Sequence, residues 1–428
     1  MRNQIEQYFD RLFPLNRSLT GNGVRETFSI LKELVDFEIT EVPTGTKAFD
    51  WTVPKEWNVN EAYILTPDGR RIADFKVNNL HLVGYSVPFS GKICFDELKK
   101  HITTRPDLPD AIPYVTSYYV ERWGFCLRHD EFLTLPEEGE YYIKIDTTLE
   151  DGCMTVGEAV LPGESGEEVL FTSYCCHPSM ANNELSGMLA LVFLYQLLKK
   201  ETKRKYTYRF YLAPETIGAI YYLSQYGMSF KEKLKGGVVI TCCGDKGQFT
   251  LKKSRSESYF NAVLKNILNN RTQGNYKELD FFPMGSDERQ YCSPGFDLPM
   301  VCLTRTMYGE YEEYHTSKDD KSVLDFSALE NYILLLKELV DSIELDGYYS
   351  NQSPYGEPQL GKRGLYPTLM KIEDRGESHK RLLYLLNYSD GKHSLLDIAN
   401  KMNTTVTSFR NEVEALQNKG LLKKGNDV

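Results

Sequence analysis

Two histidines and two carboxylates stand in polar segments that directly follow apolar, strand-like runs of the chain. His177 lies in CCHPSMANNELSG, Glu215 in APETIG, Asp287 in MGSDERQY and His315 in EEYHTSKDD. Imidazole nitrogens and carboxylate oxygens are common zinc ligands. Each segment alone fits a capped turn or a core histidine as well as a metal site. Their recurrence in one part of the chain favours a metal site that includes His177, Asp287 and His315, with nitrogen and oxygen ligands of the kind that zinc accepts.

Glu215 differs from the other three because it follows the apolar run YRFYLA and precedes a helix-like run. A carboxylate that is buried there without a partner is costly. Beside a metal-bound water, whose pKa is depressed, it would serve as a general base. A surface glutamate that caps the helix is the alternative interpretation.

The elements that must position these residues alternate between strand-like and helix-like patterns. Strand-like runs are GEEVLFTSYCC, YTYRFYLAP, GGVVITCCGD and FDLPMVCLTR, and helix-like runs include residues 187–200, 256–268 and 323–345. Alternation on this scale predicts an α/β fold with a largely parallel or mixed sheet. In such sheets, sites form from the loops at the strand ends.

A different pattern interrupts this α/β part. Residues 51–149 hold short runs rich in Val, Ile, Tyr and Phe, broken by Pro, Gly and Asn. That pattern predicts an inserted β-rich domain. Residues 1–50, which are largely helix-like, then belong with residues 150–348 in the domain that carries the site.

The C-terminal segment, residues 363–428, is predicted to be a separate winged-helix-like domain. It contains three helix-like runs, at about 376–387, 394–402 and 405–419. The third run offers Arg410 and Lys419 against Glu412 and Glu414, so it has no strongly basic face. A protein contact or a homo-oligomer is therefore favoured over specific DNA binding.

Composition and charge exclude several classes of protein. The formal net charge of −10 over 428 residues argues against a chain that binds nucleic acid along its whole surface. The N-terminus lacks an apolar run of signal-peptide length, and no stretch approaches the ~20 apolar residues of a membrane span, so we expect a cytoplasmic protein with no membrane partner. Nine cysteines without a C-x-x-C pair predict buried, reduced thiols rather than a zinc–thiolate site.

The order and wording of the four polar segments resemble the co-catalytic zinc aminopeptidases, a family of metalloproteases. That family shows a ligand His after a strand, an Asn-Asp-Asn-like turn running into Ser-Gly, a Glu-Glu pair, a Ser-Asp with an acidic or His neighbour, and Tyr-His-Thr with a following Asp. Here those places are taken, in order, by His177, ANNELSG, PET, GSDERQY and YHTSKDD. The resemblance implies a zinc-peptidase-like mixed sheet sandwiched by helices.

Over nearly its full length the chain resembles, more closely, a bacterial subfamily of aminopeptidase-like proteins. The matching phrases are LFPLNRSLTGNGVRETF, DWTVPKEWNV, WGFCL, CHPSMANNELSG, PETIG and GEYEEYHTSKDD. That subfamily has a peptidase domain with a small β domain inserted near its start and a winged helix at its end. Some members accompany polysaccharide-biosynthesis proteins, which implies a link to that process.

The resemblance implies roles for individual residues. His177 and Asp287 match ligands of one metal in the two-zinc enzymes, and His315 matches a ligand of the other. Glu215 matches the general base that takes a proton from the bridging water.

Two positions depart from the family pattern. Asn183 stands where a bridging Asp is expected, with Glu184 beside it, and Thr216 stands where the second Glu of the pair is normally a ligand. Glu184 either turns inward to replace the bridge as a metal ligand or faces solvent at the start of a helix. Because an amide is a poor zinc ligand, we expect one firmly held zinc ion, or two held with unequal affinity.

Two functions remain open from the sequence. The first is a zinc-dependent, aminopeptidase-like hydrolase that cleaves an amide bond of a small peptide or amino-acid conjugate. In that case Arg289, Arg305 and Tyr314 are candidates to bind a substrate carboxylate or the oxyanion, although each also fits an ordinary structural contact. The second is a catalytically degenerate peptidase fold that binds a ligand and regulates through its winged helix.

Overall fold

The structure, a computed structural model, describes residues 1–365 and 372–425. Contacts between Cα atoms divide the chain into two compact units. Unit 1 comprises residues 1–258 and 277–333, and unit 2 comprises residues 259–276 and 334–428. Every residue for which the sequence predicts catalysis, metal binding or substrate binding lies in unit 1.

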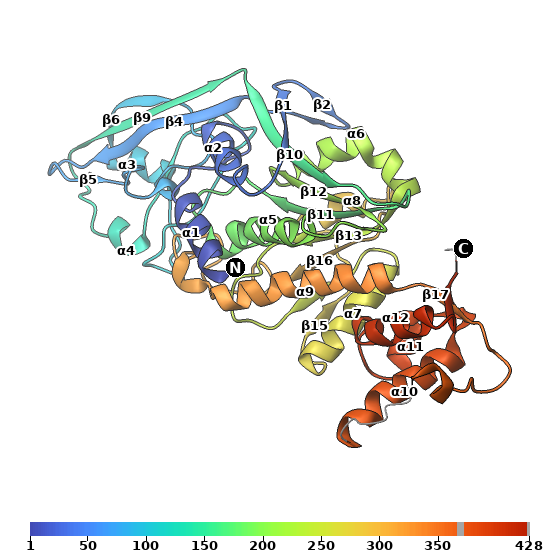
Figure 1. The fold of residues 1–428 in the computed structure, drawn as a ribbon. Coiled ribbons are helices and arrows are strands. Elements are labelled where there is room, and N and C mark those ends of the chain that lie inside the picture. The colour runs from blue at the N-terminus through green and yellow to red at the C-terminus, as the bar shows by residue number, and fades with distance from the viewer. Residues whose placement is uncertain (366–371, 426–428) are drawn as a thin grey trace. The chain divides into compact units, whose positions relative to one another are not determined.

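Unit 1 is built on an eight-stranded sheet (Figure 1). In spatial order its strands are β1 (Glu38–Pro43), β10 (Cys153–Leu161), β12 (Thr207–Ala213), β11 (Glu168–Tyr174), β13 (Leu234–Ile240), β16 (Met300–Thr304), β14 (Thr250–Lys252) and β15 (Lys277–Leu279). The central strands β12, β11, β13 and β16 run parallel. Strands β1 and β10 pair antiparallel with their neighbours, and β14 pairs antiparallel with β16 but parallel with β15. Strand β11 is buried along its whole length, as expected for a parallel strand covered on both faces. The predicted mixed α/β sheet is confirmed.

Helices flank this sheet. Helix α5 (Ser186–Leu198) is apolar nearly all round, so it packs against β11, β12 and β13 with most of its side chains buried. A π-helical turn, Ala181–Leu185, leads into it. The other helices that unit 1 contains or shares are α1 (Arg2–Leu12), α2 (Asn22–Leu31), α3 (Phe95–Leu98), α4 (His129–Phe132), α6 (Ile217–Lys233), α8 (Glu288–Tyr291) and α9 (Phe326–Leu345).

A four-stranded antiparallel sheet lies within the segment predicted as a β-rich insertion. Its strands, in order, are β5 (Arg71–Ile72), β4 (Glu56–Leu65), β9 (Glu140–Glu150) and β6 (Phe89–Cys94), and the last three lie side by side in Figure 1. Two short pairs accompany it, β2 (Lys47–Ala48) with β3 (Trp51–Thr52) and β7 (Ile102–Thr103) with β8 (Phe125–Cys126).

The inserted segment touches the loop that carries His315. A β-bridge pairs Pro113 with Thr316, and the N–H of Tyr114 donates to the carbonyl oxygen of His315 at 2.8 Å. These backbone contacts join residues that are far apart in the sequence. They fix part of the insertion against the edge of the main sheet where the predicted site lies.

Unit 2 contains a winged helix and the additional helix α7 (Tyr259–Thr272). Its other elements are β17 (Tyr348–Asn351), α10 (Ile372–Tyr388), β18 (Asp390–Ser394), α11 (Leu395–Lys401), α12 (Arg410–Asn418) and β19 (Leu422–Lys424). Ser394 and Asp397 form a capping box at the start of α11, which explains where that helix begins. The predicted winged helix is confirmed, and its third helix is divided into a 3-10 turn, Val406–Phe409, and α12.

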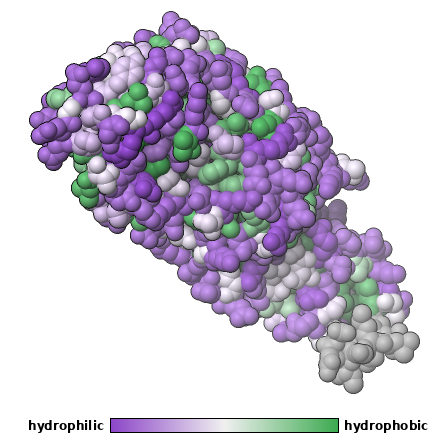
Figure 2. Space-filling view, turned by 90° about the vertical axis from the view of Figure 1, so that its left-hand side faces the viewer, coloured by the Kyte–Doolittle hydropathy of each residue, from purple (hydrophilic) through white to green (hydrophobic). Residues whose placement is uncertain are grey.

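The face of the molecule that Figure 2 shows is mostly hydrophilic, with apolar residues in small, separate patches. Within residues 1–365 and 372–425, no helix has the length and apolar character needed to cross a membrane.

Candidate active site

The structure brings His177 and Glu215 together at one edge of the main sheet. His177 follows β11 and Glu215 follows β12, and these neighbouring parallel strands end at the same edge. The Nε2 atom of His177 lies 3.9 Å from Oε2 of Glu215. The Glu215 side chain is 24 % exposed, so a small ligand can reach it from solvent.

The carboxyl group of Glu215 is electrostatically unusual. Burial raises its pKa well above the ordinary value, the negative charge of Asp287 raises it further, and the guanidinium of Arg289 acts in the opposite direction. A carboxyl with a raised pKa exchanges its proton nearer to neutral pH. Such a group in a reachable site is a candidate general base.

Asp287 is tied to the loop that follows β12. The N–H of Thr216 donates to Oδ1 of Asp287 at 2.7 Å. Thr216 has a φ of +66°, a left-handed conformation that is rare for a β-branched residue and that clusters at functional sites. Burial raises the pKa of Asp287 to about 7. Asp287 therefore lies next to the predicted base, as the metal-site prediction requires.

His315 is enclosed by aromatic rings. Tyr314 stacks on its ring at 4.0 Å between centroids, and the ring of His177 lies 5.4 Å away. Burial lowers the pKa of His315 to about 3, and the neighbouring His177 acts in the same direction. Within the described part of the chain, its Nε2 atom has no hydrogen-bond partner. A neutral imidazole with a free nitrogen is suited to bind a metal ion.

The inserted segment adds tyrosines that the sequence did not reveal. The ring of Tyr114 lies 5.1 Å from that of His177 and 5.3 Å from that of His315, and its hydroxyl is 3.3 Å from the hydroxyl of Tyr118. Neither tyrosine belongs to a recognisable motif, and both lie far from the two histidines in the sequence. Only the fold identifies them as a wall of the site.

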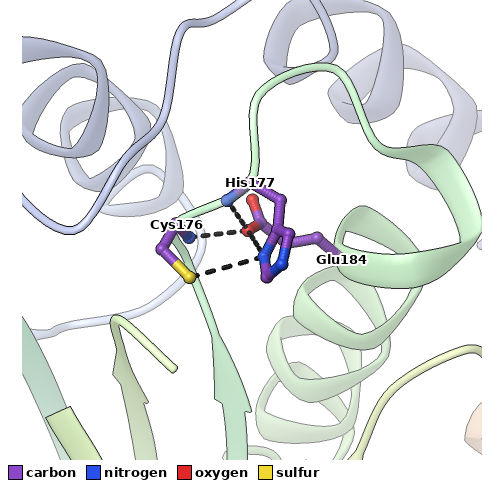
Figure 3. Close-up of side chains that lie close together, drawn as sticks. All are labelled: Cys176, His177 and Glu184. Carbon is purple, nitrogen blue, oxygen red and sulfur yellow. Dashed lines mark hydrogen bonds and ion pairs between the residues drawn. The ribbon is translucent and has the colours of Figure 1, made fainter. Parts of the chain in front are cut away.

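Cys176, His177 and Glu184 form a buried cluster (Figure 3). Oε2 of Glu184 accepts hydrogen bonds from the backbone N–H groups of Cys176, at 2.6 Å, and of His177, and it lies 3.2 Å from Nδ1 of the His177 ring. Burial raises the pKa of the Cys176 thiol well above its ordinary value, which favours the protonated thiol. The turn Ala181–Leu185 therefore folds Glu184 inward, one of the two orientations that the sequence left open.

Arg17 is a further residue that sequence reasoning missed. Its side chain is completely buried, its Nε atom is ion-paired with Oε1 of Glu184, and its Nη1 atom donates to the carbonyl oxygen of Leu12 at 2.5 Å. It belongs to the phrase LFPLNRSLTG, which contributed to the family resemblance. An arginine of that phrase cannot be assigned to a site without the fold, because arginine is normally a surface residue.

Asn183, which replaces the bridging aspartate, is fixed by its neighbours. The hydroxyl of Tyr174 lies 3.2 Å from its Oδ1 atom, whereas its buried Nδ2 atom has no partner among the described residues. Asp319 accepts the backbone N–H groups of Asn182 and Asn183 at 2.6 and 3.0 Å. Asp319 is part of YHTSKDD but had no predicted role, and the structure shows that it holds this turn.

The three predicted substrate-binding residues have different surroundings. Arg289 donates from Nη2 to Oγ1 of Thr216 at 2.7 Å, which places it beside the base. Tyr314 packs on the ring of His315. Arg305 donates to the carbonyl oxygen of Gly247 at 3.0 Å and lies over the ring of Phe249, and its contacts include no other predicted site residue. A substrate role for each of them stays a prediction.

The donor set suits zinc in its chemistry, because His177 and His315 offer imidazole nitrogens and Asp287 offers a carboxylate. The unpartnered Nε2 of His315 agrees with that use. Among the described residues, however, the group whose ligating atoms all lie within 4.8 Å of one another is Cys176, His177 and Glu184. Binding of one ion by His177, Asp287 and His315 therefore requires their side chains to move closer together.

Comparison with known protein families shows to which family the chain belongs. A family model described as a domain of unknown function (DUF4910) matches residues 6–346. The chain belongs to this family. A second model, described as a winged helix-turn-helix, matches residues 347–424.

Relatives of this family member include aminopeptidase-like proteins. A Clostridium acetobutylicum protein, named as a candidate polysaccharide biosynthesis protein with an aminopeptidase-like domain, is 43% identical over 98% of this chain and 96% of its own length. The crystal structure of a candidate peptidase from the same organism matches with a TM-score of 0.92 and 41% identity, over 99% of this chain and 96% of that chain. The predicted relationship to aminopeptidase-like proteins is confirmed.

A more distant match concerns the fold alone. BSAP, a zinc aminopeptidase from Bacillus subtilis, matches with a TM-score of 0.56 and 12% identity, over 80% of this chain and 93% of that chain. This chain thus shares the fold of that aminopeptidase, and its chemistry has to be argued from its own site.

Proposed function

We propose that this chain is a zinc-dependent, aminopeptidase-like hydrolase that cleaves an amide bond of a small peptide or amino-acid conjugate. The observation that carries the proposal is Glu215, a partly exposed carboxyl group with a raised pKa whose Oε2 lies 3.9 Å from Nε2 of His177. The zinc aminopeptidase of the same fold supports the reaction class. The name of the 43% identical relative supports a link to polysaccharide biosynthesis.

His177, Asp287 and His315 are the residues that would hold zinc. The chemistry that zinc would supply when held there is a water whose pKa is lowered to about 7 and a polarised scissile carbonyl group. Asn183 and Thr216 replace two carboxylates by neutral side chains, and this loss of negative charge favours one dication over two. We therefore assign one firmly held ion, and any second ion would bind more weakly.

The remaining chemistry falls to residues of the chain itself. Glu215 accepts the proton of the attacking water and returns it to the leaving amine. Arg289, which hydrogen-bonds Thr216 beside this base, binds a substrate carboxylate or the developing oxyanion. Tyr314 keeps the imidazole of His315 in place by stacking on it.

The alternative is a catalytically degenerate fold that binds a ligand and regulates through the winged helix. Asn183 and Thr216 favour it, because both occupy ligand positions of the two-zinc enzymes. The retained base Glu215 and the two histidines favour the enzyme, since a protein that only binds a ligand has no need of a general base.

For the winged helix we propose a protein contact, with a second copy of the chain as one such partner, rather than DNA binding. Arg410 pairs with Asp341 at 3.3 Å, and Oγ1 of Thr407 lies 3.4 Å from a carboxylate oxygen of Glu338. The start of the third helix is thus occupied by acidic residues of α9, whereas DNA binding needs free cationic side chains there. A cytoplasmic location is part of the same proposal.

The variant Glu215→Gln tests the enzyme. In zinc-loaded protein we expect the rate of hydrolysis of a panel of aminoacyl amides and dipeptides to fall at least ~100-fold, because the base is lost, while the zinc content is unchanged. The matched control is Glu164→Gln, at an exposed glutamate, which should keep both properties. Unchanged hydrolysis by Glu215→Gln would contradict the role of the base. A wild-type protein that binds no zinc would contradict the whole proposal.

A further inference from the structure

We infer that Glu184 is the positioning residue of His177, that Arg17 holds Glu184 in this role, and that Glu184 is therefore not a zinc ligand. The inference deepens the proposed function and rests on it. Figure 3 shows the central contacts, with the carboxylate of Glu184 directed at the backbone and ring of His177.

The two oxygens of Glu184 are already used by donors. Oε2 accepts the N–H groups of Cys176 and His177 and lies 3.2 Å from Nδ1 of His177, and Oε1 accepts from Arg17. Each carboxylate oxygen has about two acceptor positions, so the three donors around Oε2 leave that atom no position for a metal ion, while Oε1 faces the guanidinium of Arg17. A metal ion at Oε2 would have to displace the backbone N–H groups of Cys176 and His177. These groups lie directly after β11 and cannot turn away unless the end of that strand unwinds.

This arrangement determines which nitrogen of His177 is free. A ring nitrogen that faces a carboxylate carries the proton, so Nδ1 is the donor and Nε2 is left as the basic atom. Nε2 is the atom that lies 3.9 Å from the catalytic carboxyl of Glu215. Metal-binding histidines commonly donate their second ring N–H to a carboxylate, which fixes the tautomer and the ring orientation. Glu184 supplies that acceptor here.

Arg17 makes the buried carboxylate tolerable. The side chains of Arg17 and Glu184 are both 0% exposed, and an unpaired charge at such a position is strongly unfavourable. The bond from Arg17 to the carbonyl oxygen of Leu12 anchors the guanidinium at the end of α1. Arg17 also lines a cavity of about 10 Å³, which is about the space that one water molecule needs. The N-terminal segment thereby sets the orientation of a zinc-site histidine.

A competing assignment is that Cys176, His177 and Glu184 themselves hold the metal ion. That arrangement would use Nδ1 of His177 and the sulfur of Cys176. The sulfur instead accepts the backbone N–H of Glu215 at 3.3 Å and lies 3.4 Å from Nδ1. The sulfur of Cys176, Nδ1 of His177 and Oε2 of Glu184 therefore already contact one another or backbone N–H groups. The two assignments predict different metal ligands.

The first test needs no metal. In metal-free protein with ¹⁵N-labelled histidine, assigned with a His177→Gln variant, we expect the ring of His177 to carry its proton on Nδ1. The variant Glu184→Gln should lose this preference, because the amide is a weaker acceptor. A wild-type His177 protonated on Nε2 overturns the inference, whether or not the protein binds zinc. The Nδ1–H form in a protein that binds no zinc supports the positioning and refutes the proposed function.

The second test measures zinc affinity by competition with a chelator in Arg17→Met, Glu184→Gln and the double variant. We expect each single variant to bind zinc about 10–100-fold more weakly, as for other outer partners of metal-binding histidines. The double variant should lose less than the product of the two losses, since both act through one contact. The control is Arg209→Met, which breaks ion pairs with Glu158 and Glu168 away from the site and should lower only the melting temperature.

Two results of the second test overturn the inference. One is an unchanged zinc affinity in both single variants, which would make the ion pair merely structural. The other is direct ligation by the cluster. Cobalt-loaded wild-type protein would then show a sulfur-to-metal charge-transfer band from Cys176, or Glu184→Gln would lose one oxygen ligand in X-ray absorption while Arg17→Met did not.

Discussion

Two buried carboxylates, Asp287 in a loop at the edge of the main sheet and Glu412 in the winged helix, have opposite surroundings. At the sheet edge, Asp287 is buried without an ion pair among the described residues, and its pKa is raised to about 7. In the winged helix, Glu412 of α12 is also buried but pairs with Arg381 at 2.9 Å and accepts from Ser378. A buried carboxylate that forms no ion pair lowers stability, so its presence marks a place where a cation is expected to bind. A buried carboxylate that is ion-paired within the chain, such as Glu412, needs no bound cation.

The largest effect expected from this contrast is on metal binding by His177→Ala. The variant removes a ligand, so we expect zinc affinity to fall by more than about 100-fold, beyond the loss typical of an outer partner. Zinc content after dialysis and chelator competition measure it. The control is His81→Ala, which removes another buried histidine, bonded to the carbonyl oxygen of Cys126. Equal zinc loss in both variants would show that general destabilisation, not ligation, was being measured.

The next largest effect concerns how the free energy of unfolding of chelator-treated protein depends on pH. The folded pKa of Asp287, about 7, lies above its ordinary value of 3.8. Below about pH 4 the carboxyl is protonated in both the folded and the unfolded protein, so folding carries no penalty from its charge. As pH rises from there through 7, the unfolded protein releases this proton more readily than the folded protein does, so the free energy of unfolding falls. Asp287→Asn cannot lose a proton, so its advantage over wild type should grow by up to about 4 kcal/mol between pH 4 and pH 8.

Urea-unfolding midpoints at the two pH values measure this change. The matched control is Asp151→Asn at an exposed position, whose difference from wild type should be nearly the same at both. A pH-independent difference for Asp287→Asn would mean that the carboxylate is compensated after all, and the contrast between the two regions would disappear.

In the winged helix the expected effects are smaller and leave the zinc site unchanged. Glu412→Gln weakens the pair with Arg381, whose side chain is 24 % exposed and hence partly screened, so we expect a loss of about 2 kcal/mol. Thermal unfolding measures the loss, and zinc content and hydrolysis serve as internal controls. A fall in zinc affinity would contradict the view that this carboxylate has only a structural partner.

The smallest effect concerns Arg410. Arg410 and Asp341 are both partly exposed, so Arg410→Ala should change stability by less than about 1 kcal/mol. Fluorescence anisotropy with a labelled duplex at low salt should show no binding that depends on Arg410. If the wild type binds the duplex and Arg410→Ala binds it more weakly, the protein-contact proposal is wrong and DNA is the partner.

Much of the site could be predicted because its residues follow elements with strong local patterns. His177 and Glu215 directly follow the apolar runs that become β11 and β12, and parallel neighbours end at one edge of a sheet. The winged helix was predictable for a similar reason, since the helical periodicity of its three runs is a local signal. The family resemblance then supplied the roles of Asp287 and His315, which their local sequence does not distinguish from capped turns.

The rest could not be read from local patterns. Glu184 was predictable as a candidate but not as the partner of Arg17, since a glutamate at the start of a helix can face either way. Tyr114 enters the site only because the insertion docks on the loop of His315 through backbone contacts.

The sequence by itself therefore determined the mixed sheet, the winged helix and the segments that bear His177, Glu215, Asp287 and His315. The tertiary structure alone decided which groups support them, namely Arg17 behind Glu184, Asp319 under Asn183 and Tyr114 beside the two histidines. The physical reason is that periodicity and capping are properties of neighbouring residues. Burial of an ion pair and contact between aromatic rings depend on segments that meet only after the chain has folded.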